Sequence, residues 1–323
     1  MKAVVQSEYG SPSVMEFEDV DRPVPKDNEA LVRVRATAVN PPDWAGVYGV
    51  PYIVRLAFGI RRPMLATRGS DVAGIVDAVG KNVTGLRVGD EVFGRGVSTF
   101  AEYAVAPEEH LVTKPANVTF EQAAGVAMSG LTALQALRDT GGIRPGQKVL
   151  IVGAGGGIGT FAVQIAKSFG AEVTGVCGTA KQALVRSIGA DHVIDYTQED
   201  FTQGEKRYDL LLDNVLQHSL SDLLRVLNRK GTLVPNGGQF YKRWFASTGV
   251  LLIKAPLLSM FVPQRIRVCS ERPNQSDLLV LRELLECGKL TPVVGRTYPL
   301  SRAREAISYF GEGHAEGKVV ITV

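Results

Sequence analysis

Apolar residues follow two different periods along the chain, and the change between them predicts two regions. In the first hundred residues, short β-branched runs alternate with glycine, proline and aspartate, which predicts antiparallel strands. From about Phe120 the segments are rich in alanine and leucine, which indicates helices, and Thr119 is the expected N-cap of the first. The early strands are expected at Met15 to Asp19, Ala30 to Val39, Asp71 to Val79 and Glu91 to Phe93.

The clearest pattern is a strand–turn–helix–strand unit around a glycine cluster. Val149 to Val152 is a continuous β-branched run, as expected for a strand buried on both faces. Glycines from Gly153 to Gly159 follow, and then apolar residues recur at helical spacing up to Phe169. Free N–H groups and the positive end of the helix dipole would meet at this turn, where they favour a bound diphosphate.

The glycine spacing alone is not specific for a nucleotide. It is Gly153-x-x-Gly156-x-x-Gly159, which differs from the strict G-x-G-x-x-G pattern. A glycine-rich turn of another α/β protein would look the same, so the flanking strands and helix carry the cofactor interpretation. Strands alternate with helices after the turn, which predicts a parallel, doubly wound sheet. Those strands are expected at His192 to Tyr196, Tyr208 to Asn214, Thr232 to Asn236 and Arg265 to Cys269.

Composition narrows the class of protein. The chain has 323 residues, 45% of them hydrophobic and 21% charged, which suits two ordinary globular domains. A net charge of +3 without a basic run argues against nucleic acid as a partner. Three cysteines, none at C-x-x-C spacing, argue against a disulfide framework and a structural zinc site.

Neither a membrane span nor a signal peptide is expected. The apolar stretch 244–262 contains Lys254 and Pro256, which favours a cover helix or a subunit contact. Met1 runs straight into an apolar strand, without the charged and apolar regions of a secretory signal. A cytoplasmic protein with no membrane partner is therefore the expectation.

Short motifs lie along the chain in an order and spacing that are specific when taken together. They are Val39 to Trp44, Gly69 to Gly74, Val88 to Val92, Phe100 to Tyr103, Gly130 to Ala133, the glycine turn, Gly189 to Val193 and Gly313 to Ala315. Over essentially the whole chain they resemble the medium-chain dehydrogenase/reductase superfamily, and most closely its zinc-independent quinone oxidoreductase branch.

This resemblance implies a fold and an assembly. It implies an α/β protein with a GroES-like β-rich substrate domain and a Rossmann domain with a doubly wound parallel sheet. The first is expected at residues 1–121 with a return segment at 272–323, and the NADP-binding Rossmann domain at residues 122–271. A nicotinamide cofactor in the cleft and a homodimer are further implications of the resemblance.

The zinc ligands of the related alcohol dehydrogenases are replaced in this chain. Those enzymes carry a Cys where Asn40 stands, and Gly-His-Glu where Gly69-Ser70-Asp71 stands, and their four-cysteine lobe is missing here. Without thiolate and imidazole ligands, nothing is expected to hold a Lewis-acid zinc. The sequence therefore predicts no metal site.

The residues that follow the second strand of the strand–turn–helix–strand unit predict which nicotinamide cofactor binds. An acidic residue there normally binds the adenosine ribose of NAD, but this chain continues Gly178-Thr179-Ala180-Lys181. Lys181 can pair with a 2′-phosphate, although it could also be a solvated lysine at a helix start, and Tyr196 resembles the family tyrosine that packs there. NADPH is the expected cofactor. From this reasoning and the resemblance, its expected contacts are Asn40, Thr132, Gly155, Gly156, Gly157, Ile158, Gly178, Thr179, Lys181, Tyr196, Asn214, Gly237, Val268, Ser270, His314, Ala315 and Lys318.

The expected chemistry is hydride transfer that the protein assists by position and electrostatics. Asn40 and Tyr48 are the catalytic candidates, to hold the nicotinamide and the acceptor carbonyl. Tyr48 could also donate a proton, but a loop aromatic commonly only packs. Asp43 is expected to cap a short helix after two prolines rather than to act as a base.

The expected function is zinc-independent, NADPH-dependent hydride transfer to a small-molecule quinone or α,β-unsaturated carbonyl. No His/Ser/Asp relay or carboxylate pair is visible for removing an alcohol proton. Two alternatives stay open: a zinc-free NAD(P)-dependent alcohol or aldehyde oxidoreductase, and a nucleotide-binding protein with little catalysis. The uninterrupted glycine turn and Asn40 favour an enzyme.

Overall fold

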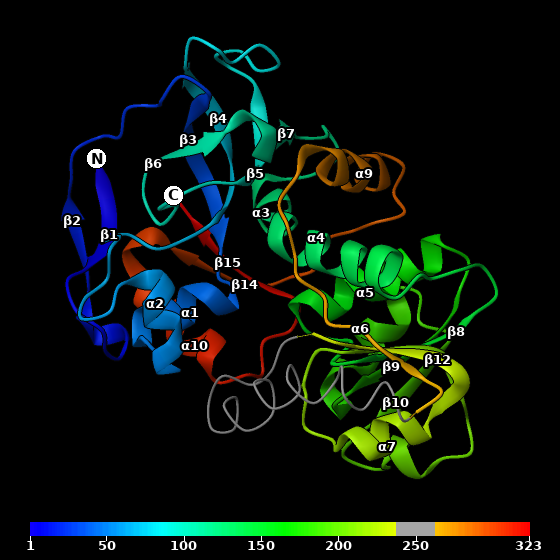
Figure 1. The fold of residues 1–323 in the computed structure, drawn as a ribbon. Coiled ribbons are helices and arrows are strands. Elements are labelled where there is room, and N and C mark those ends of the chain that lie inside the picture. Colours follow the sequence, from blue (N-terminus) through cyan, green and yellow to red (C-terminus); the bar gives the residue numbers. More distant parts are fainter. Residues whose placement is uncertain (237–261) are drawn as a thin grey trace. The chain divides into compact units, whose positions relative to one another are not determined.

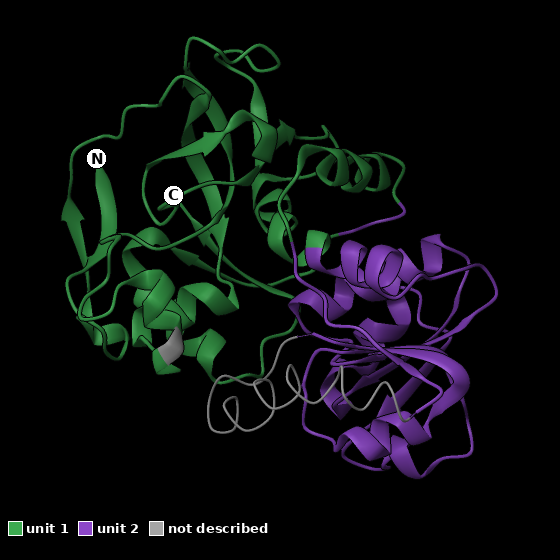
Figure 2. Cartoon of the chain, in the orientation of Figure 1, with its two compact units in different colours: residues 1–131, 272–288, 292–323 green, residues 132–271, 289–291 purple. Residues whose placement is uncertain are grey.

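The computed structural model describes residues 1–236 and 262–323, which form two compact units (Figures 1 and 2). Unit 1 consists of Met1–Leu131, Arg272–Gly288 and Pro292–Val323. Unit 2 consists of Lys289–Thr291 and the described part of Thr132–Glu271. Gly237 and all but the last residue of the apolar stretch 244–262 lie outside the described residues. The domain limits expected from the sequence stay a prediction.

Unit 1 is built on a mainly antiparallel sheet in the order β14-β15-β3-β4-β5-β7, with β6 paired to β3. Its antiparallel pairs confirm the β-rich first region. The last strand, β15, lies antiparallel to β3, so the C-terminus returns to this sheet as expected. The strands are β3 (Glu29–Ala38), β4 (Asp71–Val79), β5 (Glu91–Arg95), β6 (Tyr103–Pro107), β7 (Leu111–Thr113), β14 (Val294–Pro299) and β15 (Lys318–Thr322).

A hairpin-like pair and several helices complete unit 1. The expected N-cap Thr119 is confirmed, because its side chain accepts from the N–H of Gln122. Pro41 and Pro42 open α1, where a proline costs no hydrogen bond. These elements are β1 (Lys2–Gln6), β2 (Met15–Asp19), α1 (Pro41–Tyr48), α2 (Arg55–Phe58), α3 (Phe120–Ala124), α9 (Gln275–Glu286) and α10 (Ala303–Gly311), and α4 (Ala127–Gln135) runs from unit 1 into unit 2.

Unit 2 is a six-stranded sheet in the order β10-β9-β8-β11-β12-β13, and every pair is parallel. The doubly wound parallel sheet, and with it the α/β fold class, is confirmed. The strand order reverses between β8 and β11, which is where ligands bind in such sheets. The elements are β8 (Lys148–Val152), α5 (Gly157–Ser168), β9 (Glu172–Cys177), α6 (Gln182–Ser187), β10 (His192–Asp195), β11 (Tyr208–Asp213), α7 (Leu220–Arg225), β12 (Leu227–Pro235) and β13 (Arg265–Ile266).

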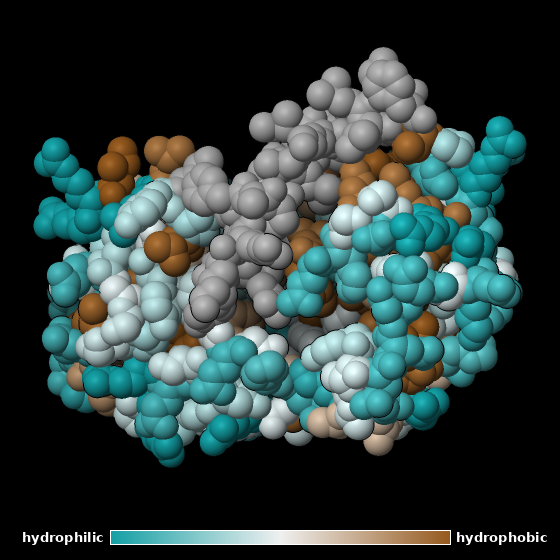
Figure 3. All heavy atoms as spheres, turned by 90° about the horizontal axis from the view of Figure 1, so that it is seen from below, coloured by the Kyte–Doolittle hydropathy of each residue, from teal (hydrophilic) through white to brown (hydrophobic). Residues whose placement is uncertain are grey.

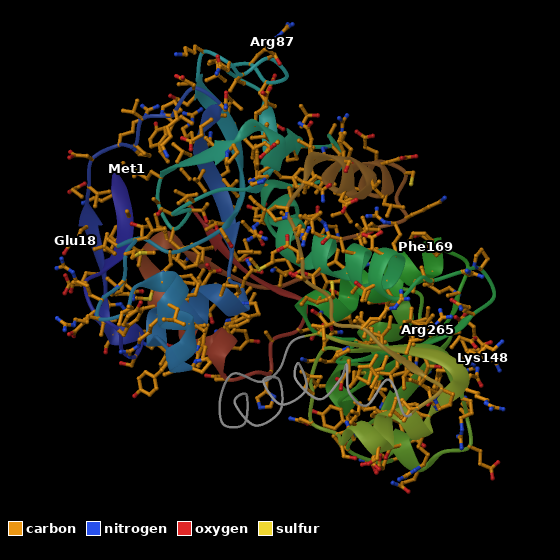
Figure 4. All side chains as sticks on the ribbon, viewed as in Figure 1. Met1, Glu18, Arg87, Lys148, Phe169 and Arg265 are labelled. Carbon is orange, nitrogen blue, oxygen red and sulfur yellow. The ribbon has the colours of Figure 1, made fainter. Side chains whose placement is uncertain are left out.

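The surfaces of both units mix polar and apolar side chains. Glu18, Arg87 and Arg265 are exposed charged residues, and Figure 4 shows Glu18 and Arg87 at the periphery of unit 1. The face in Figure 3 carries apolar side chains interspersed with hydrophilic ones. Of the helices that the structure describes, none has both the length and the apolar character needed to cross a bilayer.

The glycine turn of unit 2 depends on two of its glycines for different reasons. Gly153 has a φ of +76°, a conformation that side chains disfavour. Gly159 has no room for a side chain, because a Cβ there would lie 2.1 Å from the carbonyl oxygen of Gly153. The first turn of α5 therefore rests directly on the backbone that leaves β8.

Replacing Gly159 should disrupt this contact. Gly159→Ala is expected to lower the free energy of unfolding by at least about 1–3 kcal/mol, because a methyl group is forced against a backbone oxygen. Gly204→Ala is the matched control, since the nearest atom to its Cβ would be 3.5 Å away. Urea unfolding of both variants checks this, and equal stability of the two would contradict it.

Candidate functional site

Four segments of unit 1 bring polar side chains together in its interior. They are the start of α1, the starts of β4 and α4, and the start of β15. The Asp71 cluster, as we call it, consists of Asn40, Asp43, Asp71, Ser129 and Lys318, all of them buried. Two carboxylates and an ammonium group therefore share one water-excluded space.

Asp71 lies at the centre of the Asp71 cluster and is fully buried. Its Oδ1 accepts from the backbone N–H of Met128 at 3.0 Å, and its Oδ2 accepts from Asn40 Nδ2 at 2.9 Å. Two cations lie beside the carboxylate: Lys318 Nζ at 3.7 Å and Arg95 Nε at 3.9 Å. A buried carboxylate needs such partners, because leaving water is costly for an isolated charge.

Lys318 enters the Asp71 cluster from the first residue of β15. Its Nζ donates to Asn40 Oδ1 at 2.6 Å and to Ser129 Oγ at 3.0 Å. Burial lowers the pKa of Lys318, and the neighbouring carboxylates of Asp71 and Asp43 oppose that shift. The remaining amide hydrogen of Asn40 points to the carbonyl oxygen of Ala38 at 3.2 Å. Both amide hydrogens and one lone pair of Asn40 are thus engaged inside unit 1.

Asp43 caps the start of α1, as predicted. Its Oδ2 accepts from the backbone N–H of Asn40 at 2.8 Å, and its Oδ1 accepts from the backbone N–H of Gly69 at 3.2 Å. Burial raises the pKa of Asp43 to about 7; the Asn40 hydrogen bond opposes this shift and the charge of Asp71 adds to it. Asp43 therefore joins α1 to the segment that leads into β4, and it titrates near neutral pH.

Tyr48 is the last residue of α1 and is half-buried. Its ring stacks on Trp44 one turn earlier, with centroids 4.4 Å apart and planes inclined by 29°. The ring of Tyr48 therefore packs within α1, and its catalytic role stays a prediction. The two catalytic candidates thus lie at opposite ends of one eight-residue helix, Asn40 at its N-cap and Tyr48 at its last position.

In unit 2, the residues expected at the cofactor gather around the glycine turn. The N-cap of the twelve-residue helix α5 is Gly156, so Gly157 and Ile158 open its first turn. The side chain of Lys181 crosses Gly155, where a Cβ would lie 2.8 Å from Lys181 Cδ. The turn thus combines the backbone N–H groups at the start of α5 with a cation, which suits a diphosphate and its attached nucleoside.

The loop after β9 is fixed by Asp195, a residue that the sequence did not single out. Asp195 Oδ2 accepts from Thr179 Oγ1 at 2.6 Å and from Gln182 Nε2 at 3.0 Å, and Oδ1 accepts from Thr197 Oγ1 at 2.8 Å. These bonds, led by Thr179, lower the pKa of Asp195. In the sequence, the only feature that could have pointed to Asp195 was its place at the carboxyl end of an expected strand.

The remaining expected contacts are spread over both units. Tyr196 is exposed, and its hydroxyl would lie 3.2 Å from a Cβ on Gly178. Asn214 donates to the carbonyl of Val152 at 3.1 Å and accepts from Asn236 at 2.8 Å, which joins the ends of β8, β11 and β12. The others lie as follows: Thr132 in α4, Val268 and Ser270 after β13, and His314 and Ala315 between α10 and β15.

The Asp71 cluster does not suit a zinc ion. Zinc in dehydrogenases is held by thiolate and imidazole groups, whereas the positions in question carry Asn40, Ser70 and Asp71. The ammonium of Lys318 lies against Asn40 and Asp71, where it would repel a cation. In the described residues, no group of three or more His, Cys, Asp or Glu could hold a metal. The absence of a metal stays a prediction.

Two family models match the chain: an alcohol dehydrogenase GroES-like domain over residues 26–116, and a zinc-binding dehydrogenase over residues 188–321. The quinone oxidoreductase of Homo sapiens is 31% identical, over 99% of this chain and 97% of that protein. A 2-methylene-furan-3-one reductase of Solanum lycopersicum is 32% identical, over 99% of this chain and 79% of that protein. The structure of Escherichia coli quinone oxidoreductase complexed with NADPH is similar with a TM-score of 0.85 and 26% identity, over 100% of both chains.

The raised pKa of Asp43 predicts a pH dependence of stability. Between about pH 4 and pH 7 the unfolded chain has lost the Asp43 proton while the folded chain retains it. The free energy of unfolding should therefore fall as the pH rises through this window, by up to about 1.4 kcal/mol per pH unit from this group. Asp43→Asn should lose that component of the slope.

Urea unfolding of the wild type and Asp43→Asn across the window measures the difference in slope. Asp200→Asn is the control, because hydrogen bonds from Thr202 hold the pKa of Asp200 below its usual range. Parallel pH curves for the wild type and Asp43→Asn would contradict the assignment.

Proposed function

We propose that this chain reduces a quinone or an α,β-unsaturated carbonyl with NADPH. The chain belongs to the medium-chain dehydrogenase/reductase superfamily and to its zinc-independent quinone oxidoreductase-like branch. Like these relatives, it is an oxidoreductase, and it uses a nicotinamide dinucleotide. The observation that carries the choice of NADPH is the side chain of Lys181 lying across Gly155.

The reaction balances as a two-electron reduction. NADPH, when bound, would supply a hydride for the quinone or for the β-carbon of the enone. A proton would complete the hydroquinone or the saturated carbonyl, and NADP⁺ would leave. The chain has to orient the two reactants and stabilise negative charge on the acceptor oxygen, which needs no strong general base.

Residues of unit 2 would bind the cofactor. The N–H groups of Gly155 and Gly157 at the start of α5 would hold the diphosphate. Gly156, whose own N–H donates to the carbonyl of Gly153 at 3.1 Å, would line the same turn. Lys181 would pair with the adenosine 2′-phosphate, and Thr179, fixed by Asp195, would stand beside it. Further proposed contacts are Thr132, Ile158, Gly178, Tyr196, Asn214, Gly237, Val268 and Ser270, together with His314 and Ala315 of unit 1.

Residues of α1 would serve the reacting groups. The Tyr48 hydroxyl is proposed to donate to the acceptor carbonyl, while the ring stays stacked on Trp44. Asn40 is proposed to contact the nicotinamide, with its side chain held in one orientation by three hydrogen bonds. We also propose a homodimer and the domain limits 1–121 with 272–323, and 122–271. A cytoplasmic location stays a prediction.

The nucleotide assignment predicts a selective loss of affinity. Lys181→Ala removes a charge-assisted contact worth roughly 1.5–3 kcal/mol, so NADPH should bind about tenfold or more weakly while NADH binds as before. Lys206→Ala, which removes an exposed lysine elsewhere in unit 2, should leave both affinities unchanged. Fluorescence titration of the reduced nicotinamide gives the dissociation constants, and equal wild-type affinity for NADPH and NADH would refute the assignment.

The reaction assignment predicts which acceptors are used. Oxidation of NADPH should be fast with quinones, enones or enals and slow with simple aldehydes, and a chelator should not lower it. Tyr48→Phe should reduce turnover without abolishing it, because water can supply the proton. Rapid oxidation of simple alcohols, with no activity on any quinone or enone, would overturn the proposed function in favour of an alcohol oxidoreductase.

A further inference from the structure

The Asn40 amide is held between two opposite charges, and this fixes which way it faces. An ammonium group has only donors and a carboxylate has only acceptors. Oδ1 must therefore face Lys318, at 2.6 Å, and Nδ2 must face Asp71, at 2.9 Å. Turning the amide over would replace both charge-assisted bonds by repulsive contacts.

Asn40 is also the N-cap residue of α1, so holding its side chain holds the residue at which the helix begins. Asp43 ties the Asn40 backbone to Gly69 with bonds of 2.8 and 3.2 Å. One turn later, Trp44 is buried and stacks on Tyr48. The start of α1 is therefore fixed by both the backbone and the side chain of Asn40, and the Tyr48 ring follows from it.

We propose that Asp71 and Lys318 form a positioning pair, which holds the Asn40 amide and thereby sets the place of α1 and Tyr48 for turnover. Lys318 is then a positioning residue rather than a direct ligand of the cofactor. Its ammonium group is buried, and it bonds or pairs with Asn40, Ser129 and Asp71, which all belong to unit 1. This inference rests on the proposed function for its activity readout.

Because Asp71 and Lys318 are an ion pair, variants can distinguish a positioning role of the pair from a purely structural one. Removing one partner of a buried ion pair leaves an uncompensated charge and strongly destabilises a fold, whereas removing both partners is often neutral. Asp71→Asn or Lys318→Met alone should therefore lower the midpoint of thermal unfolding. The double variant Asp71→Asn/Lys318→Met should recover most of that loss, because the cation that it leaves, Arg95, is partly exposed to water. It would still lack the two charges that orient Asn40.

The experiment compares the double variant with its parent in a Trp244→Phe background. The chain has two tryptophans, so this background makes Trp44 the single fluorescent tryptophan. The double variant should keep its dissociation constant for NADPH within about twofold, and lose about tenfold or more in kcat with a quinone, as expected for misplaced groups. Acrylamide should quench Trp44 more strongly, because the start of α1 is no longer fixed.

The control removes the same charges from the surface of unit 1. Lys2→Met/Asp19→Asn deletes an exposed pair at 2.6 Å, and it should leave kcat and Trp44 quenching at the parent values. A double variant with parental kcat and parental quenching would overturn the proposal and assign the pair to folding alone. A tenfold weaker NADPH affinity with unchanged kcat at saturation would also overturn it, because Lys318 would then be a cofactor ligand.

The two readouts separate this proposal from the proposed function. If the parent reduces no quinone or enone, the proposed function fails. Trp44 quenching then still decides the positioning role: stronger quenching in the double variant supports it, and unchanged quenching overturns it.

Discussion

The pairing of one buried ammonium with one buried carboxylate, through a shared amide, is the constraint on which unit 1 depends. Lys318 and Asn40 are separated by 278 positions in the sequence, yet their side chains form one of the shortest contacts in the Asp71 cluster. The last strand reaches the cap of the first helix only because β15 lies beside β3. Charges taken out of water require partners at fixed places, so the Asp71 cluster defines where four chain segments must meet.

In unit 2, the glycine turn between β8 and α5 is determined by backbone conformation rather than by buried charges. Gly153 bends the chain at the end of β8, and Gly159 lets α5 rest on that bend without a side chain between them. The turn then presents backbone N–H groups, which need no charged residue to attract a diphosphate. Asp195 contributes indirectly, because it holds Thr179 and Gln182 in the loop beside Lys181.

Local patterns predicted the elements that local physics dictates. The β-branched run Val149 to Val152, the bend at Gly153 and the cap at Thr119 each follow from a few neighbouring residues. The helix α10 was missed because Arg302, at its N-cap, gives no capping hydrogen bond. β13 is shorter than expected, and β6 and β7 were not predicted, since short strands depend on partners far away in the chain.

The candidate site was predictable only in part for the same reason. Asp43 as a cap follows from the two prolines beside it, and this was confirmed. The pairing of Asp71 with Lys318 has no local signature, and the resemblance to a family pointed to Lys318 only as a cofactor contact. Two partners of Asp195, Thr179 and Gln182, lie 16 and 13 positions earlier in the chain, and the fold brings them beside the end of β10. The role of Asp195 therefore emerges only in three dimensions.

The central claim is that this protein delivers a hydride from NADPH to a polarised carbon–carbon double bond or a quinone. It is tested most directly with NADPH that carries deuterium at the transferred position of the nicotinamide, with an enone as acceptor. The account predicts that mass spectrometry finds one deuterium on the β-carbon of the saturated product. A product formed without deuterium, or no product from any enone or quinone, would contradict it.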